Sequence, residues 1–222
     1  MSNQIKSSLM TALTAHAGAL NTVPNTKESV LAGLAYIGEG NIEVDVRFSP
    51  NGVPVLGHDA VRDESAFTLE ECFALARDYT ARINLDLKEA DGNVPEVQRL
   101  AEQYGMLDRV FFTGVRAKDV PKVREYGIPY YLNVYPGGLM ARWPWAMKRL
   151  ARKAKALNVV GLNLLHSWVT PALVNAVRAE GLEVSAWTVD TPADAKRLLA
   201  LGVDNITSRK PDMLTPIMKE HT

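Results

Sequence analysis

The chain has 222 residues, of which 47% are hydrophobic, and its 25 Lys and Arg residues balance its 25 Asp and Glu residues. A chain of this length buries about 70% of its unfolded surface, so we expect one domain over residues 1–222 with no structural disulfide or metal. The zero net charge gives no overall field that attracts nucleic acid or anionic lipid. We therefore expect a small-molecule partner, no nucleic acid and no stable membrane association.

Cysteine usage and hydropathy set further limits. The single cysteine, Cys72, lies in an apolar-periodic stretch over residues 69–76, where we expect it to pack within a helix. The N-terminal residues show no uninterrupted apolar segment with a cleavage site, and no stretch approaches about 18 consecutive apolar residues. These features predict a soluble, cytoplasmic protein.

Strand-like apolar runs alternate with amphipathic helical stretches, which is typical of a parallel sheet with crossover helices. In chain order, we expect strands at 10–15, 41–48, 82–87, 110–113, 130–134, 159–164, 183–188 and 205–207. Helices are expected to begin near Thr26 and to cover 68–79, 94–104, 117–126, 145–156, 170–180 and 192–201. Thr26 is suited to cap the first of them, and glycines follow several of the others.

This rhythm predicts an α/β fold. Eight strand–helix units in a chain of this size indicate a compact, single (β/α)8 TIM barrel, and an open doubly wound sheet is the alternative. The turn Ser49-Pro50-Asn51-Gly52 predicts a β-hairpin that returns over residues 53–56. Only 24 residues separate Asp59 from Asn84, and those over 68–79 look helical, so little of this stretch remains for an additional subdomain.

Acidic side chains gather at the carboxyl ends of the predicted strands, where a TIM barrel carries its chemistry. Glu43 and Asp45 alternate with aliphatic residues, so both carboxylates lie on one face of their strand. Asp86 ends the following barrel strand, and Lys88 shares its face. Three inward carboxylates need compensation and favour one hard divalent cation, Mg²⁺ or Ca²⁺. Separate salt-bridged or surface acids are the alternative.

Two histidines follow strands close to these acids. His16 ends the first strand, and His58 ends the returning strand of the hairpin. Histidine exchanges a proton near neutral pH, so a pair beside a metal-bound phosphate can act as general base and general acid. His166 also ends a strand and can line the pocket, whereas we expect His221 to be a solvated tail residue.

Several short motifs recur in a fixed order along the chain. They are His16-x-Gly18, Asn25-Thr26, Glu43-x-Asp45, Asn51-Gly52, His58-Asp59, Asn84-Leu-Asp-Leu-Lys88, Trp187-Thr-Val and Gly202-Val-Asp204 through Pro211-Asp212. Taken together, they resemble the glycerophosphodiester phosphodiesterase family over essentially the whole chain. The most specific part is Glu-x-Asp followed by Asn-Gly and His-Asp.

The resemblance implies a hydrolase of lipid metabolism that needs a divalent metal, releases an alcohol from a glycerophosphodiester and leaves glycerol phosphate. It also implies that an internal hydroxyl of the substrate attacks phosphorus, and that water then opens the resulting cyclic phosphate. The implied site consists of catalytic His16 and His58, metal ligands Glu43, Asp45 and Asp86, a phosphate contact from Lys88 and a pocket wall at Trp187. Packing in the barrel core is the alternative role for Trp187.

The sequence departs from the family pattern at three positions. Ala17 follows the first histidine, where the family usually has arginine; Pro24 replaces an expected glutamate; and Asp86 stands where glutamate is commoner. Arg209, beside Lys210 after the eighth strand, is our candidate for the missing phosphate-binding charge, because TIM barrels often bind phosphate in this loop. A solvated loop is the alternative.

Alternatives also stay open for the function and for one aromatic segment. A related phospholipase of the sphingomyelinase D or phosphatidylinositol-specific kind would act on intact lipid, and a barrel without catalysis would only bind a phosphorylated ligand. The tryptophans of Trp143-Pro144-Trp145 either contact a lipid or alcohol head group or pack beneath the barrel rim. The released alcohol, the preferred ion and the oligomeric state are not predicted.

Overall fold

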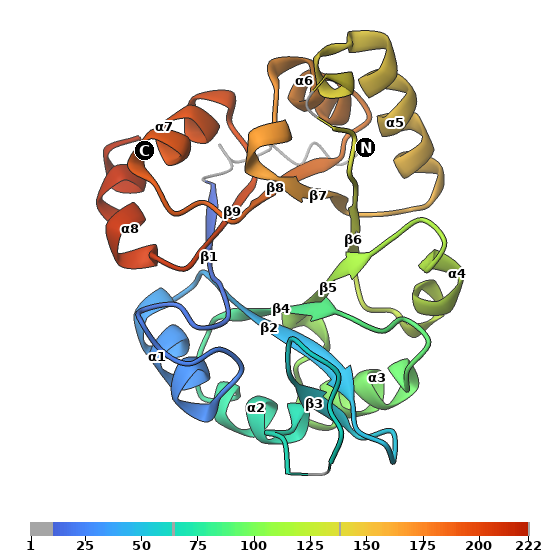
Figure 1. Ribbon diagram of the computed structural model, residues 1–222, viewed down its shortest axis with the longest axis vertical. Coiled ribbons are helices and arrows are strands. Elements are labelled where there is room, and N and C mark those ends of the chain that lie inside the picture. The colour runs from blue at the N-terminus through green and yellow to red at the C-terminus, as the bar shows by residue number, and fades with distance from the viewer. Residues whose placement is uncertain (1–10, 64, 138, 222) are drawn as a thin grey trace, which may run out of the picture.

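The structure, a computed structural model, describes residues 11–63, 65–137 and 139–221. Within these residues, eight parallel strands close into a barrel that is surrounded by helices (Figure 1). The strands are β1 (Ala12–Ala15), β2 (Asn41–Phe48), β4 (Arg82–Leu87), β5 (Val110–Val115), β6 (Tyr130–Asn133), β7 (Gly161–Leu165), β8 (Glu183–Trp187) and β9 (Asn205–Ser208). Neighbours follow the order β1-β9-β8-β7-β6-β5-β4-β2, and pairing of β1 with β2 closes the ring. The predicted (β/α)8 barrel is therefore confirmed, and the open sheet is excluded.

The outer helices are α1 (Lys27–Ile37), α2 (Leu69–Ala76), α3 (Val94–Gln103), α4 (Val120–Val123), α5 (Pro144–Ala156), α6 (Pro171–Ala179), α7 (Pro192–Leu201) and α8 (Pro211–Glu220). Short 3-10 turns cover Leu107–Arg109, Arg124–Tyr126, Met140–Arg142 and His166–Trp168. The Thr26 hydroxyl accepts a hydrogen bond from the backbone N–H of Ser29, which confirms the predicted cap of α1. Across the described residues, no helix is both long and apolar enough to cross a bilayer.

Two helices differ from the prediction. The helix expected over 117–126 is only the single turn of α4 followed by a 3-10 turn, because Pro121 lacks a backbone N–H and Gly127 adopts a left-handed φ of 67°. Helix α8 was not predicted at all. It contains Pro216, which interrupts the helical signal in the sequence.

The predicted hairpin is present. Strand β3 (Pro54–Leu56) runs antiparallel to β2, with Val46 opposite Leu56 and Phe48 opposite Pro54. Gly52 has a φ of 79°, and its N–H donates to the carbonyl of Ser49 at 2.8 Å, which closes the turn. The strand expected over 10–15 is confirmed from Ala12 onward, while Met10 lies outside the described residues.

The alternation on β2 decides which side chains enter the barrel. Ile42 faces outward, since a side-chain atom at Gly33 of α1 would approach the Ile42 methyl group to 3.0 Å. Glu43 and Asp45 therefore point to the interior. Asp45 lies opposite Asp86 of β4 in the parallel register, so the carboxylates of two strands meet at the same level of the barrel.

Polar side chains fill much of the barrel interior below the acids, where branched aliphatic residues are more usual. Asn205 accepts hydrogen bonds from the Thr14 hydroxyl at 2.7 Å and the Asn41 amide at 3.2 Å. The Asn205 amide donates to the Ser185 hydroxyl at 2.9 Å. These buried groups satisfy one another, which removes the cost of burying them and gives the barrel a hydrogen-bonded floor.

Cys72 provides a test of the apolar packing of helix α2 against the barrel. It is fully buried in α2, and burial raises the pKa of its thiol to about 12. We expect the native protein to react with a disulfide reagent only as fast as it opens, because the thiolate is the nucleophile. The denatured protein should react with the reagent at once, through one thiol per chain. A Ser167→Cys variant, with an added thiol at an exposed position, is the control and should react promptly in native buffer. Prompt reaction of the unmodified native protein would contradict the packing.

Candidate active site

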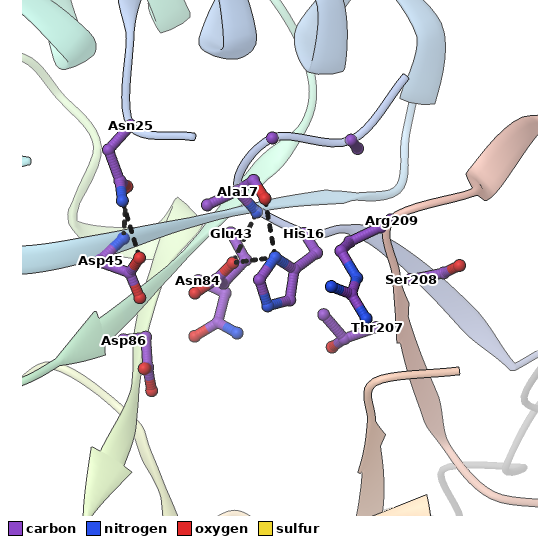
Figure 2. A network of polar contacts seen from close by, with 12 residues as sticks. His16, Ala17, Asn25, Glu43, Asp45, Asn84, Asp86, Thr207, Ser208 and Arg209 are labelled. Carbon is purple, nitrogen blue, oxygen red and sulfur yellow. Dashed lines mark hydrogen bonds and ion pairs between the residues drawn. The ribbon is translucent and has the colours of Figure 1, made fainter. Parts of the chain in front are cut away.

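A pocket of about 280 Å³ opens at the carboxyl ends of the barrel strands. Its lining includes seven of the eight predicted site residues, namely His16, Glu43, Asp45, His58, Asp86, Lys88 and Trp187. Arg209 is not part of this lining, although Figure 2 shows it beside His16. The pocket also contains polar residues that the sequence did not single out as site residues, namely Asn84, Thr113, Asn133, Asn163, Thr188 and Thr207, together with Tyr135.

The three predicted metal ligands converge. One carboxylate oxygen from each of Glu43, Asp45 and Asp86 lies within 4.8 Å of the other two. Glu43 and Asp45 are buried, and Asp86 is half-buried. Burial raises the pKa of Glu43 well above its usual value, and the nearby charges of Asp45 and Asp86 raise it further. This cluster therefore carries more negative charge than its surroundings compensate.

Lys88 supplies part of the compensation. Its ammonium group lies 2.6 Å from Asp45 Oδ1 and also pairs with Asp86 Oδ2. Burial by itself lowers the pKa of Lys88, but the two carboxylates outweigh it and raise that pKa. Burial likewise acts to raise the pKa of Asp45, yet hydrogen bonds from Lys88 and Asn25 hold it below its usual value.

Asn25 fixes the position of Asp45, and the sequence did not reveal this contact. The Asn25 amide donates to Asp45 Oδ2 at 2.7 Å, and its carbonyl oxygen accepts from the Asp45 backbone N–H at 3.0 Å (Figure 2). Asn25 adopts a φ of 61°, a conformation that asparagine tolerates better than most residues. Both contacts cross 20 residues of sequence, so no local pattern indicates them.

His16 lies at the edge of the acidic cluster. Its Nδ1 is 2.7 Å from the carbonyl oxygen of Ala17 and 3.7 Å from Glu43 Oε2 (Figure 2). A carbonyl oxygen only accepts, so Nδ1 carries a hydrogen and Nε2 is the nitrogen left to exchange a proton. The Ala17 backbone N–H donates to Glu43 Oε2 at 2.7 Å, which links the histidine loop to the acid.

His58 reaches the pocket from the loop after β3. It is far more exposed than His16, with 73% of its side chain accessible against 31%. Its Nδ1 lies 3.0 Å from Asp59 Oδ1, which orients the ring. Arg47 anchors the loop, since its Nε donates to the His58 carbonyl at 2.9 Å and its guanidinium pairs with Glu89.

The predicted aromatic and phosphate-binding residues have different outcomes. Trp187 lines the pocket, and its indole N–H is buried with no hydrogen-bond partner among the described residues. Arg209 donates from Nε to Asp190 Oδ2 at 2.8 Å and keeps 61% of its side chain exposed. Trp143 and Trp145 are exposed, so they do not pack beneath the rim. His166 contacts Asp194 at 3.2 Å and is not part of the pocket lining.

The donor set fits a divalent cation. Three converging carboxylates are hard oxygen ligands of the kind that Mg²⁺ and Ca²⁺ prefer. One ammonium group faces three acids, so the cluster has a net excess of negative charge when all three acids are ionised. Two further positive charges at this point would remove that excess.

The model of the Glycerophosphoryl diester phosphodiesterase family matches residues 93–213, which is more than half of the chain. The chain belongs to this family. The family's reaction is the hydrolysis of glycerophosphodiesters, and this protein is accordingly a phosphodiesterase. The matched residues contain Trp187 and Arg209, whereas the histidines and acids of the pocket precede them.

Full-length relatives agree with the family. The chain is 24% identical to a glycerophosphodiester phosphodiesterase of Caldanaerobacter subterraneus, with 96% of this chain and 99% of that protein aligned. It is 26% identical to a probable glycerophosphodiester phosphodiesterase 2 of Mycobacterium tuberculosis, over 90% of this chain and 85% of that protein. Because 96% of this chain aligns with the first of these relatives, the N-terminal residues that line the pocket fall inside the region shared with it.

Solved structures share the fold. A putative glycerophosphoryl diester phosphodiesterase from Agrobacterium tumefaciens superposes with a TM-score of 0.81 at 23% identity, covering 96% of this chain and 98% of that one. A phosphodiesterase from Oleispira antarctica, solved with its product sn-glycerol-3-phosphate, superposes with a TM-score of 0.77 at 20% identity, over 96% and 98% of the two chains.

Glu43→Gln tests the charge balance of the site. Without metal, removal of the repelled carboxylate should stabilise the protein by about 1–2 kcal/mol, measured by chemical unfolding in EDTA. Because folding raises the Glu43 pKa, the folded chain holds more protons than the unfolded chain at pH values between the two pKa values. Stability of the metal-free protein should therefore fall as the pH rises through this window, and the variant should lack that slope.

The same variant should also lose most of the stabilisation that Mg²⁺ or Ca²⁺ gives the unmodified protein. Glu125→Gln makes the same charge change at an exposed position and should leave both behaviours unchanged. Equal stabilisation by metal in all three proteins would show that Glu43 does not bind the ion.

Proposed function

We propose that this protein hydrolyses glycerophosphodiesters to glycerol phosphate and an alcohol, with one divalent cation held by Glu43, Asp45 and Asp86. The observation that supports this proposal most is the meeting of two histidines, three converging carboxylates and a lysine in one pocket at the barrel mouth. The proposed catalytic unit is a single domain, residues 1–222. A small-molecule diester as substrate and a cytoplasmic location complete the proposal, and the location stays a prediction from the sequence.

When bound, the cation would draw charge from the phosphoryl oxygens and offset the negative charge that develops during attack. Lys88 lines the pocket and donates to two carboxylates of the cluster. Its ammonium group can therefore also donate to an oxygen of a phosphate bound there. Three carboxylates, a divalent cation and one lysine sum to zero charge. Another positive group must therefore attract the anionic diester, and Arg209, which Figure 2 shows next to His16, is our candidate outside the pocket lining.

The two histidines perform the proton transfers. One takes the proton of the substrate hydroxyl as its oxygen forms the new bond to phosphorus, and the other gives a proton to the alcohol oxygen as the old bond breaks. Water later opens the cyclic phosphate with the roles reversed. His16 uses Nε2, because Nδ1 is occupied by the Ala17 carbonyl. His58 is oriented for the same use of Nε2 by Asp59 at Nδ1.

Trp187 and Arg209 contribute to binding. The indole N–H of Trp187 is a buried donor without a partner among the described residues, and an oxygen of the bound diester would satisfy it. Arg209 would exchange its contact with Asp190 for the phosphate, in place of the arginine that usually follows the first histidine. Ala17 occupies that position here and is buried.

Substitution of either pocket histidine tests the chemistry. His16→Ala and His58→Ala should each lower kcat for glycerophosphocholine by about 10²–10⁴-fold, because a positioned proton donor or acceptor is lost. His221→Ala, at an exposed position, is the matched control and should keep full activity. Release of glycerol phosphate, measured with Mg²⁺, Ca²⁺ or EDTA, gives the readout. Full activity of either pocket variant, or of the unmodified protein in excess EDTA, would refute the proposal.

Arg209→Ala tests phosphate attraction separately from chemistry. We expect KM for the diester to rise by about three- to tenfold with kcat nearly unchanged, since an exposed charge contributes modestly. Lys210→Ala removes the same charge from the next residue and should change KM less. Equal effects of the two substitutions would indicate that the positive charge of the loop as a whole attracts the diester. They would exclude a specific contact from Arg209.

A further inference from the structure

The zero net charge of the chain conceals a strong segregation of charge. Residues 126–179 contain seven Lys or Arg residues and no Asp or Glu. This segment includes β6, α5, β7 and α6, which lie side by side on one side of the barrel (Figure 1). One side of the molecule is therefore basic, and the excess of acid lies in the rest of the chain.

Helix α5 presents most of this charge to solvent. Lys148, Arg149, Arg152 and Lys153 line one face of the helix together with Trp145, and all of them are exposed. Arg152 has a partner, Glu180, at 3.6 Å. Within the described residues, no carboxylate lies within ion-pair distance of Lys148, Arg149 or Lys153. These cations are available to an external anion.

An exposed apolar cluster adjoins this face at the start of α5. Of the eight large hydrophobic side chains exposed in the described residues, five lie between residues 135 and 145. Leu139 is 76% exposed and Trp145 is 64% exposed. Leu139, Met140, Trp143 and Trp145 line a shallow hollow of about 640 Å³. The rings of Trp143 and Trp145 meet edge to face, with centroids 6.4 Å apart.

Tyr135 connects this apolar cluster to the catalytic pocket. It belongs to the lining of the pocket, and its ring packs edge to face on Trp168 with centroids 5.9 Å apart. Residues 135–137 and 139–143, which include the 3-10 turn Met140–Arg142, lie between β6 and α5, at the carboxyl end of the barrel. The apolar cluster therefore lies on the rim of the pocket mouth.

We infer that Leu139, Met140, Trp143 and Trp145, with Lys148, Arg149 and Lys153, form a docking surface for an anionic lipid bilayer. Tryptophan prefers the level of the lipid head groups, and adjacent lysine and arginine bind anionic head groups there. The exposed leucine and methionine gain from contact with acyl chains. An acidic protein or a nucleic acid would match the cations alone and would leave the leucine and methionine in water.

Docking on this surface is reversible, since it relies on a few side chains and no spanning segment. It differs from the expectation of no stable membrane association, which rested on the net charge of the whole chain and did not consider how the charge is distributed. The docked protein holds the mouth of its pocket at the lipid surface. The inference stands on the surface alone and does not depend on the proposed reaction.

Vesicle binding with matched charge variants tests the electrostatic part. The unmodified protein should sediment with vesicles of phosphatidylglycerol and phosphatidylcholine, should bind pure phosphatidylcholine much less, and should be released by salt. Lys148→Glu with Lys153→Glu should weaken binding by at least about 25-fold, about fivefold per lysine removed. Lys27→Glu with Lys196→Glu makes the same charge change on exposed residues of α1 and α7 and should bind normally.

The apolar part has its own test. Trp143→Ser with Trp145→Ser should abolish quenching of tryptophan fluorescence by brominated lipid, and should weaken binding to anionic vesicles by at least about tenfold. Circular dichroism should be unchanged, because both rings are exposed. Hydrolysis of a soluble diester should also be unchanged in every docking variant, which separates this inference from the proposed function.

Three results would overturn the inference. They are failure of the unmodified protein to bind anionic vesicles, equal loss of binding in the α1 and α7 control, and retention of binding after both tryptophans are replaced. Self-association or nucleic-acid binding through the same residues, without vesicle binding, would assign the surface to another partner and would also overturn it.

Discussion

Three carboxylates that converge inside the barrel are the constraint on which the rest of the site depends. Glu43, Asp45 and Asp86 have ligand oxygens within 4.8 Å of one another, in a position that water reaches poorly. Such a cluster is unfavourable unless positive charge and hydrogen-bond donors surround it. The structure supplies Lys88, the Asn25 amide and the Ala17 N–H, each directed at one or two of the acids. A divalent cation would neutralise the negative charge that these groups leave uncompensated.

The same constraint links catalysis to the backbone around His16. The Ala17 N–H holds Glu43, and the Ala17 carbonyl holds Nδ1 of His16, so one residue orients both a proposed metal ligand and a proposed acid/base group through its main chain. The Ala17 side chain takes no part in these contacts. This explains how alanine can replace arginine at this position without disturbing the geometry, although the guanidinium charge is lost. The missing guanidinium would have attracted the anionic diester. We therefore propose that Arg209 supplies this attraction.

Sequence reasoning located the barrel, the hairpin and the acidic cluster because each leaves a periodic or local signal. Alternation along β2 indicates that Glu43 and Asp45 share a face, and Asn51-Gly52 indicates the turn. It did not find Asn25 as the partner of Asp45, or Asn205 as the centre of the polar floor. Both depend on contacts between distant parts of the chain that only closure of the barrel creates. Helix α8 was missed because Pro216 opposes the local helical signal, while packing against the barrel stabilises the helix regardless.

Net charge alone is a weak guide to partners for a related reason. A sum over the chain describes the field far from the molecule, but at physiological ionic strength charges act over only about 8 Å. Within that range, a lipid surface approaching α5 meets Lys148, Arg149 and Lys153 without any acid from residues 126–179. The acids that neutralise the total are elsewhere, and three of them lie inside the barrel. The buried cluster that serves the proposed chemistry thus contributes to the zero net charge, while Lys148, Arg149 and Lys153 on α5 have no carboxylate within ion-pair distance among the described residues.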